Sequence, residues 1–190
     1  MKTQSEIFYE QHCHSGPYGM DYEARREAIE KFGFPVITDE AVQAILRFGP
    51  KFLEVGSGLG YLSYLIKERG GDVIATDIAT VDHSKYAHIL KPKHYWIWPQ
   101  VMKGLRAVKR YPQRTLILSW PCYNDDWAFK VLRASQCRYL VYIGEGWGGC
   151  TATDKFFKLL DENLVEVEDL PRIPNWDGIH DDLRIFCRKS

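Results

Sequence analysis

A glycine-rich turn is the clearest chemical feature of this sequence. Gly56, Gly58 and Gly60 alternate with Ser57 and Leu59, after a short apolar run and before an amphipathic one. Glycines allow the chain to turn sharply and a ligand to lie against the main chain, and the beginning of a helix offers N–H groups without partners. The pattern predicts a site for a nucleotide-like cofactor, and a turn without a ligand is the alternative.

Two carboxylates flank this turn. Glu54 lies just before the first glycine, and Asp77 follows the next apolar run, about 20 residues further on, where a carboxylate can accept hydrogen bonds from both hydroxyls of a ribose. The spacing GxGxG places Tyr61 where a dinucleotide site has its third glycine, and Glu54 suits a cationic methionine group better than a phosphate. S-adenosylmethionine is therefore favoured over NAD. The residues expected to bind the cofactor are Glu54, Gly56, Ser57, Gly58, Gly60, Asp77 and Ile78.

A second candidate site follows the apolar run at 115–119. It consists of the segment Ser119-Trp120-Pro121-Cys122-Tyr123. A rigid turn of this kind can present backbone carbonyls and an aromatic ring, and so hold an amine or a base against a methyl donor by orientation. Ser119, Pro121 and Tyr123 are the candidates for this role, and a buried Trp-Pro turn without chemistry is the alternative.

Glu145 is the fourth catalytic candidate, and it lies in the glycine-rich segment 144–149. Its carboxylate can orient a substrate, or act as a base if burial raises its pKa, whereas a solvated loop carboxylate is the simpler interpretation. His12, Cys13 and His14 are not typical of a metal centre, because adjacent ligands do not easily close around one ion and no matching pair follows. We therefore expect no metal.

The elements that must position these residues alternate between strands and helices. Apolar runs predict strands at 51–55, 72–75, 115–119 and 138–143, and amphipathic periodicity predicts helices at 22–32, 38–49, 61–69, 99–110, 125–135 and 153–160. A strand, glycine turn, helix and strand form a βαβ unit, which indicates a parallel sheet. Two further strands, at 164–167 and 183–187, have no helix between them and should pair antiparallel.

Two segments are harder to assign. Residues 1–20 are polar and rich in glycine and proline towards their end, which predicts an irregular leader. Residues 78–98 contain three histidines and the cluster His94, Tyr95, Trp96 and Trp98, and we expect at most one short helix and one short strand there.

Composition limits the class of protein. The chain has 190 residues, 45% of them hydrophobic, with 25 lysines and arginines against 25 aspartates and glutamates. We expect one domain, with residues 1–49 forming a cap and 50–190 the catalytic core. Neutral charge argues against binding nucleic acid mainly through phosphates, so the basic residues at 103–114 are interpreted as a solvated helix face. Five scattered cysteines, with no signal peptide and no membrane-spanning run, predict a cytoplasmic protein without membrane contact.

Several motifs together resemble class I S-adenosylmethionine-dependent methyltransferases. They are FLEVGSGLGYLSYLI, DVIATD, YPQRTLILSWPCY, YLVYIGEGWGGCT and DDLRIFCRK, and with the upstream Phe34-Pro35 they cover most of 34–190. The series is similar to a group of methyltransferase-like proteins, mostly of unassigned substrate, with a Trp-Pro-Pro turn after the fourth strand, from which Cys122 departs. The resemblance implies an α/β, Rossmann-like fold with a mostly parallel seven-stranded sheet, a C-terminal antiparallel hairpin and helices on both faces. It also implies donor binding by Glu54, Gly56, Gly58, Gly60 and Asp77.

These observations predict a methyltransferase that uses S-adenosylmethionine. We expect a small-molecule acceptor rather than a nucleic acid, because 190 residues leave little beyond the cofactor fold for recognising a large target. The acceptor should lie between the 119–123 loop, Glu145 and the N-terminal leader. The alternatives are a non-catalytic methyltransferase-like protein that serves as an interaction or cofactor-binding module, a nucleic-acid base N-methyltransferase, and an NAD-linked enzyme. The oligomeric state is not predicted.

Overall fold

The computed structural model of the chain describes residues 1–13, 22–78 and 94–189, and these contain a mixed sheet of seven strands. The order across the sheet is β3-β2-β1-β4-β5-β7-β6. The first five strands in this order are parallel, whereas β7 runs antiparallel to both β5 and β6, as predicted. The strands are β1 (Lys51–Val55), β2 (Asp72–Asp77), β3 (Gln100–Val101), β4 (Thr115–Ser119), β5 (Tyr139–Gly144), β6 (Leu164–Glu166) and β7 (Asp182–Arg188).

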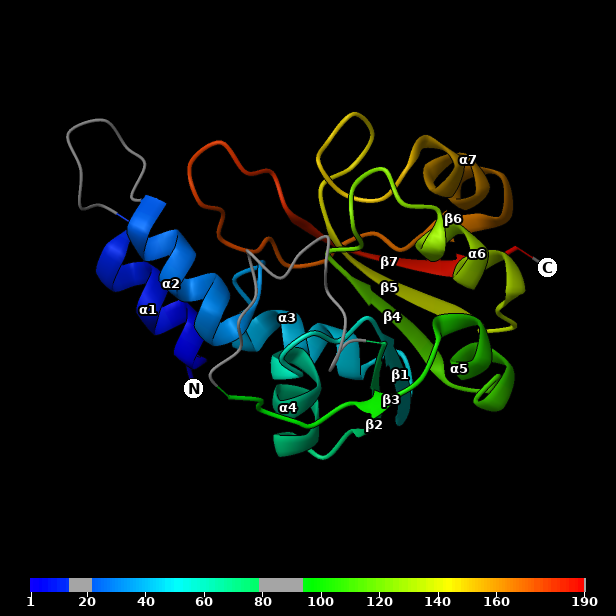
Figure 1. The fold of residues 1–190 in the computed structure, drawn as a ribbon, viewed down its shortest axis with the longest axis horizontal. Coiled ribbons are helices and arrows are strands. Elements are labelled where there is room, and N and C mark those ends of the chain that lie inside the picture. The colour runs from blue at the N-terminus through cyan, green and yellow to red at the C-terminus, as the bar shows by residue number, and fades with distance from the viewer. Residues whose placement is uncertain (14–21, 79–93, 190) are drawn as a thin grey trace.

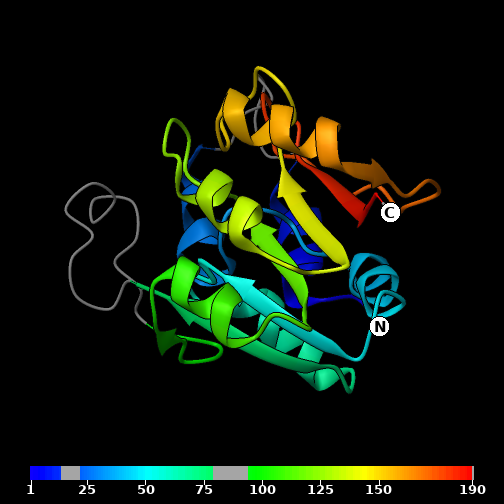
Figure 2. The same cartoon turned by 90° about the vertical axis from the view of Figure 1, so that its right-hand side faces the viewer.

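Helices cover both faces of this sheet (Figures 1 and 2). They are α1 (Gln4–His12), α2 (Tyr22–Phe32), α3 (Asp39–Leu46), α4 (Tyr61–Glu68), α5 (Gly104–Arg110), α6 (Trp127–Ala134) and α7 (Asp154–Asn163). Among these residues no helix is both long enough and apolar enough to cross a membrane. The predicted Rossmann-like fold, with its mostly parallel sheet and C-terminal antiparallel strands, is therefore confirmed.

The sheet has a hydrophobic core on each face, because side chains alternate between the two faces along each strand. In β4, Leu116 and Leu118 pack with α5, α6 and α7, whereas Ile117 packs on the opposite face with α3 and α4. In β5, Leu140 likewise faces the first core and Val141 the second. Because both faces are buried, these strands are continuous apolar runs, which is typical of parallel sheets.

The prediction of an irregular leader is wrong for residues 4–12. Thr3 accepts a hydrogen bond from the backbone of Glu6, and the Glu6 carboxylate accepts one from the backbone of Thr3 at 2.7 Å, which completes a capping box at the beginning of α1. Phe8 then packs between α2 and Trp176 in a small third core. The remaining leader residues, 14–20, lie outside the described part of the chain. A capping box ahead of a weakly amphipathic segment was the signal that indicated this helix.

The helix expected at 99–110 begins later, at Gly104. Gln100 and Val101 instead pair with Thr76 and Asp77 as the edge strand β3. Of the uncertain segment 78–98, residues 79–93 lie outside the described residues, and 94–98 form neither helix nor strand. The chain thus returns to the sheet immediately beside the carboxyl end of β2.

Candidate functional site

The glycine turn between β1 and α4 is fixed to the neighbouring strand. The backbone N–H groups of Gly56 and Ser57 both donate to the carbonyl oxygen of Thr76 in β2, at 2.8 and 3.1 Å. Gly56, Gly58 and Gly60 have φ values of 75°, 54° and 72°, in the left-handed region that L side chains rarely adopt. All three glycines are therefore required by the backbone conformation.

Protein covers both ends of this turn and leaves its middle open. A Cβ atom on Gly60 would lie 2.5 Å from the carbonyl oxygen of Ile97, and one on Gly56 would lie 3.0 Å from the ring of Trp127. At Gly58 the same atom would meet nothing within 4 Å. A ligand can therefore approach the main chain at Gly58.

The two flanking carboxylates have different environments. Asp77 accepts a hydrogen bond from the backbone N–H of Gly58 at 2.8 Å, so it lies at the open part of the turn. Glu54 is only 2% exposed and accepts a hydrogen bond from the Ser63 hydroxyl of α4 at 2.5 Å. Burial raises the pKa of Glu54 to about 7, the bond from Ser63 opposes this rise, and the charge of Asp77 adds to it. Glu54 thus stabilises the turn by joining the end of β1 to α4 through Ser63.

Ser57 supplies an independent indication of a ligand. Its Oγ atom is buried and has no hydrogen-bond partner among the described residues. A buried polar atom without a hydrogen-bond partner destabilises the folded protein, so such atoms usually bind a ligand or a water molecule. Ile78, which is 63% exposed, lies next to Asp77 at the rim of the same site. A hydroxyl, open space against the main chain at Gly58, a carboxylate and an apolar rim fit a nucleoside that carries a polar chain.

The loop after β4 is held from several sides. The backbone N–H of Trp120 donates to Ile143 at 2.7 Å, and its indole N–H donates to the Asp181 carboxylate at 2.7 Å. Its ring stacks on Phe34, with the ring centroids 4.3 Å apart. Trp120 also has a φ of 52°, a strained conformation that costs about 1–3 kcal/mol and persists only where the surroundings impose it.

The rest of this loop contacts the loop after β5. The carbonyl oxygen of Pro121 accepts a hydrogen bond from Ala152 at 2.9 Å, and Cys122 pairs with Thr151 in an isolated antiparallel bridge. Cys122 therefore takes part in a fixed backbone pairing, at the position where the resemblance seen in the sequence predicts a second proline. Tyr123 is 64% exposed and extends from the end of the loop.

Glu145 joins two loops rather than lying free in solvent. Its Oε2 accepts from the backbone N–H of Cys150 at 2.6 Å, and its Oε1 accepts from the backbone N–H of His180 at 2.9 Å. Burial alone would raise the pKa of Glu145, but the hydrogen bonds from Cys150 and His180 outweigh burial and lower it. Glu145 is therefore a charged, 6% exposed carboxylate, and the interpretation as a solvated loop residue is wrong. The condition for its use as a base, a raised pKa, is not met.

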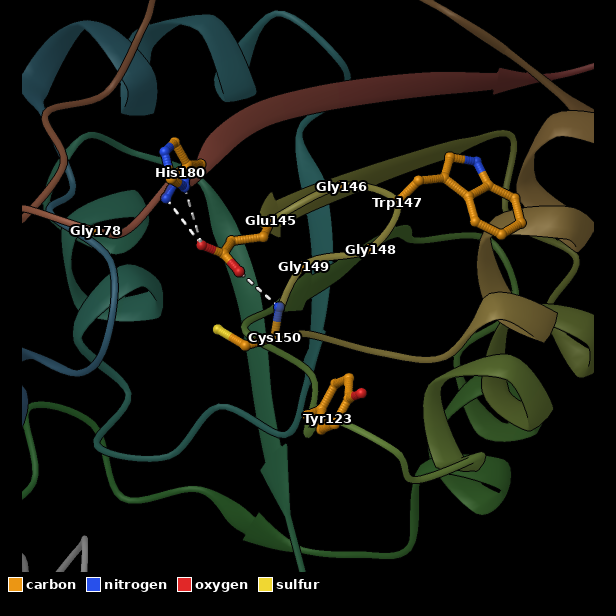
Figure 3. A pocket seen from close by; sticks show the side chains of 9 residues that line it. All are labelled: Tyr123, Glu145, Gly146, Trp147, Gly148, Gly149, Cys150, Gly178 and His180. Atoms are coloured by element: carbon orange, nitrogen blue, oxygen red, sulfur yellow. Dashed lines mark hydrogen bonds and ion pairs between the residues drawn. The ribbon is translucent and has the colours of Figure 1, made fainter.

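A pocket of about 550 Å³ lies beside Glu145 (Figure 3). The Nδ1 atom of His180 is 3.7 Å from the Glu145 Oε1 atom, and the imidazole is 85% exposed. The Trp147 ring turns away towards α7, where its N–H donates to Asp161 at 3.0 Å. The residues that line the pocket are Tyr123, Glu145, Gly146, Trp147, Gly148, Gly149, Cys150, Gly178 and His180.

The structure thus brings together only part of the predicted catalytic set. Tyr123 and Glu145 share the pocket, whereas Ser119 and Pro121 are not among its lining residues. His180 was not predicted, because it lies 35 residues beyond Glu145 in an irregular segment, and no local pattern connects the two. The Asp-Gly pair before it indicated a turn, and a histidine next to a turn was the available signal.

All of these residues lie at one edge of the sheet. The glycine turn follows β1, Asp77 ends β2, Ser119 ends β4 and Glu145 follows β5. Because these strands are parallel, their carboxyl ends meet at the same edge, which is where ligands bind in open α/β sheets. No group of histidine, cysteine or carboxylate side chains that could hold a metal is found in the part of the chain that the structure describes, and His14 lies outside it.

Comparisons with known proteins define the fold. No family model and no curated protein matches the chain. Among solved structures, the magnesium protoporphyrin IX methyltransferase of Synechocystis with bound S-adenosylmethionine is 10% identical, covers 97% of each chain and has a TM-score of 0.53. An S-adenosylmethionine-dependent methyltransferase of Anabaena variabilis is 11% identical, with 88% of this chain and 93% of that one covered and a TM-score of 0.52. A Burkholderia thailandensis 1,6-didemethyltoxoflavin N1-methyltransferase is 16% identical, covers 80% of both chains and has a TM-score of 0.50. The chain therefore has the Rossmann-like fold of the S-adenosylmethionine-dependent methyltransferases.

Proposed function

We propose that this protein is a methyltransferase that takes its methyl group from S-adenosylmethionine and places it on a small-molecule acceptor. The observation that carries the proposal is the open turn at Gly58, with the unpartnered Ser57 hydroxyl and Asp77 beside it. Two of the similar structures were solved with S-adenosylmethionine or S-adenosylhomocysteine bound. The closer resemblance to proteins with a Trp-Pro-Pro turn remains a prediction from the sequence.

The donor half of the site consists of the turn and the end of β2. Asp77 would hold the ribose hydroxyls, Ser57 and the backbone at Gly58 the polar methionine end, and Ile78 would cover an apolar face. Glu54 would stabilise the turn through its hydrogen bond with Ser63 rather than contact the donor itself. When bound, the sulfonium supplies an already activated methyl group, so the protein's task is in-line placement and removal of charge from the acceptor.

The acceptor half is the pocket at Glu145. Its volume of about 550 Å³ falls within the range of small-molecule sites. The charged Glu145 carboxylate holds the backbone of His180 by accepting its N–H at 2.9 Å, and the imidazole stays exposed at the pocket with its Nδ1 3.7 Å from the Glu145 Oε1 atom. His180 then accepts the proton that the acceptor nitrogen or oxygen loses as it is methylated, and passes it to solvent. Glu145 and Tyr123 position the acceptor, and the role of Ser119 and Pro121 is to hold the loop beneath it.

The donor site is tested by calorimetric titration with S-adenosylhomocysteine. Gly58→Val should abolish binding, because a side chain at this open position fills the space that the ligand needs. Gly70→Val is the matched control, since Gly70 is also left-handed, with φ of 87° and nothing within 4 Å of a Cβ atom, but ends α4 away from the turn. Both variants place a β-branched residue at a left-handed backbone position, so a loss of binding in Gly58→Val alone identifies the site.

Two outcomes would contradict the proposal. If neither Gly58→Val nor Asp77→Ala changes the saturable binding of S-adenosylhomocysteine, the donor does not bind at this turn. If NAD competes for the site, the NAD-linked alternative is favoured. The acceptor class is tested by incubating the protein with radiolabelled donor and separated fractions of a cell extract. Label in the small-molecule fraction supports the proposal, and label in nucleic acid alone supports base methylation instead.

A further inference from the structure

One stretch of the chain contains most of its unbalanced positive charge. Residues 102–138 hold eight lysines and arginines against two aspartates, Asp125 and Asp126, so the remainder of this neutral chain has an excess of six acidic side chains. Asp126 already forms an ion pair with Lys155 of α7 at 2.8 Å. Arg114 of the stretch is likewise paired with Asp72 of β2 at 2.9 Å, so these two ion pairs leave its excess of six positive charges unchanged.

The structure collects six of these residues on two neighbouring helices. Gly104 in α5 lies against Val131 in α6, so close that a Cβ atom there would be 2.6 Å from the valine side chain. The buried sides of both helices face the sheet, and their charged sides face outward. We call this surface the basic face: its exposed residues are Lys103, Arg106, Lys109 and Arg110 at α5 and Lys130 and Arg133 in α6.

None of these six side chains forms an ion pair with any residue that the structure describes. Arg106 and Arg110 are four residues apart on one helix, where like charges repel and destabilise the helix. Elsewhere basic side chains are paired, as Lys158 is with Glu162 and Arg114 with Asp72. An anion on the basic face would relieve this repulsion.

Two of the arginines are held in place by aromatic rings. The Arg110 guanidinium lies 5.6 Å from the centroid of the Tyr111 ring, and that of Arg133 lies 5.1 Å from the centroid of Phe129. A stacked guanidinium keeps its N–H groups in a plane that matches the oxygens of a phosphate, and less freedom is lost when it binds. Several such groups along a surface fit a chain of phosphates better than a single one.

We propose that the basic face binds nucleic acid through its phosphates, without reading base sequence. Helices α5 and α6 run back from the carboxyl ends of the strands, so the face extends away from the acceptor pocket. Bound nucleic acid is therefore held at the protein rather than presented as the acceptor. The inference does not depend on the proposed methyl transfer, and the neutral total charge makes the attraction local to α5 and α6.

The experiment measures fluorescence anisotropy of labelled single-stranded RNA, duplex RNA and duplex DNA, each titrated with the full chain at several salt concentrations. Counterion release predicts an affinity that falls linearly with salt on logarithmic axes, on the order of 100-fold between about 50 mM and about 200 mM for four to five phosphate contacts. The double variant Lys109→Gln, Lys130→Gln should bind about tenfold more weakly at low salt and lower the salt slope by about 2.

The matched control removes two lysines outside the basic face, Lys67 in α4 and Lys158 in α7. Lys67→Gln, Lys158→Gln changes the net charge equally but leaves the basic face and the Asp126–Lys155 ion pair intact, and should keep the wild-type affinity and slope. Donor binding and thermal unfolding of both variants confirm that they are folded. Equal weakening by both pairs, affinity without salt dependence, or equally tight binding of labelled polyglutamate would each overturn the proposal, the last in favour of an acidic protein partner. The three nucleic acids distinguish which backbone the face prefers.

Discussion

The proposed chemistry at the acceptor pocket depends on His180, whose position is set by Glu145. The backbone N–H of His180 donates to Glu145 at 2.9 Å, so the main chain fixes the base of the side chain while the imidazole stays exposed. Glu145 in turn keeps its charge because hydrogen bonds from Cys150 and His180 lower its pKa. Gly149 is required beside it, since a Cβ atom there would lie 2.4 Å from the Cβ of Glu145.

At this residue scale we expect His180→Gln to lower kcat about 100-fold or more, the typical contribution of a positioned base, without changing donor affinity. The measurement is turnover of labelled donor with an identified acceptor, with donor affinity measured in parallel by calorimetry. His94→Gln, at another exposed histidine, is the control and should retain wild-type turnover. If His180→Gln turns over at the wild-type rate, proton removal does not involve this imidazole.

At the scale of elements, three segments meet at the loop after β4. Trp120 stacks on Phe34 from the α2–α3 connection and donates to Asp181 from the segment before β7. Asn175 fixes that segment, because its side chain accepts from the backbone N–H of Asp181 at 2.7 Å and donates to its carbonyl oxygen at 2.9 Å. The left-handed conformation of Trp120 is thus imposed by contacts on both sides of its ring.

We expect Trp120→Phe to lower the free energy of unfolding by about 1–3 kcal/mol, because the smaller phenyl ring can still stack on Phe34 but leaves the buried Asp181 carboxylate without its donor. Urea denaturation measures the change. Trp98→Phe is the control, since Trp98 is 66% exposed and its substitution should have little effect. Equal losses in the two variants would show that the indole N–H contributes nothing beyond the ring.

Features formed by residues close together in the chain could be predicted from the sequence, whereas contacts between distant residues could not. β1, β2, the glycine turn between them and the place of Asp77 at the end of β2 were predicted correctly, because they belong to one βαβ unit in which local periodicity and glycine spacing carry the information. The contacts of Glu145 with His180 and of Trp120 with Asp181 could not be predicted, since each joins residues far apart along the chain. The helix α1 was missed for a different reason, because its hydrophobic pattern is weak and only the capping box at Thr3 and Glu6 indicates it.

At the scale of the whole molecule, the buried carboxyl groups give folding a pH dependence. Burial raises the pKa of Glu54 to about 7 and that of Asp181 to about 6, in the latter case against the hydrogen bond from Trp120. A carboxyl group with a raised pKa binds more protons in the folded chain than in the unfolded chain, so stability falls as the pH rises from its unfolded towards its folded pKa. For Glu54 this range extends from 4.5 to about 7.

We therefore expect the free energy of unfolding to fall more steeply with pH in the wild type than in Glu54→Gln, by an amount on the order of 2–3 kcal/mol over this range. The amide stays neutral, and its oxygen can still accept the hydrogen bond from Ser63. Urea denaturation at pH 5 and about 7.5 measures the difference. Glu68→Gln, at an exposed position of α4, should leave the slope unchanged. Parallel pH profiles of wild type and Glu54→Gln would show that Glu54 ionises without penalty.

The insertion of β7 between β5 and β6 has a consequence for the order in which the site assembles. The donor turn closes through contacts within residues 54–77, so its loop-closure entropy is small. Gly178 and His180, which line the pocket, lie just before β7 and are brought to Glu145 when β7 pairs with β5. Because long-range pairing forms late in folding, a folding chain should acquire its cofactor site before its acceptor pocket. The pairing of β7 with β5 therefore completes the proposed acceptor pocket.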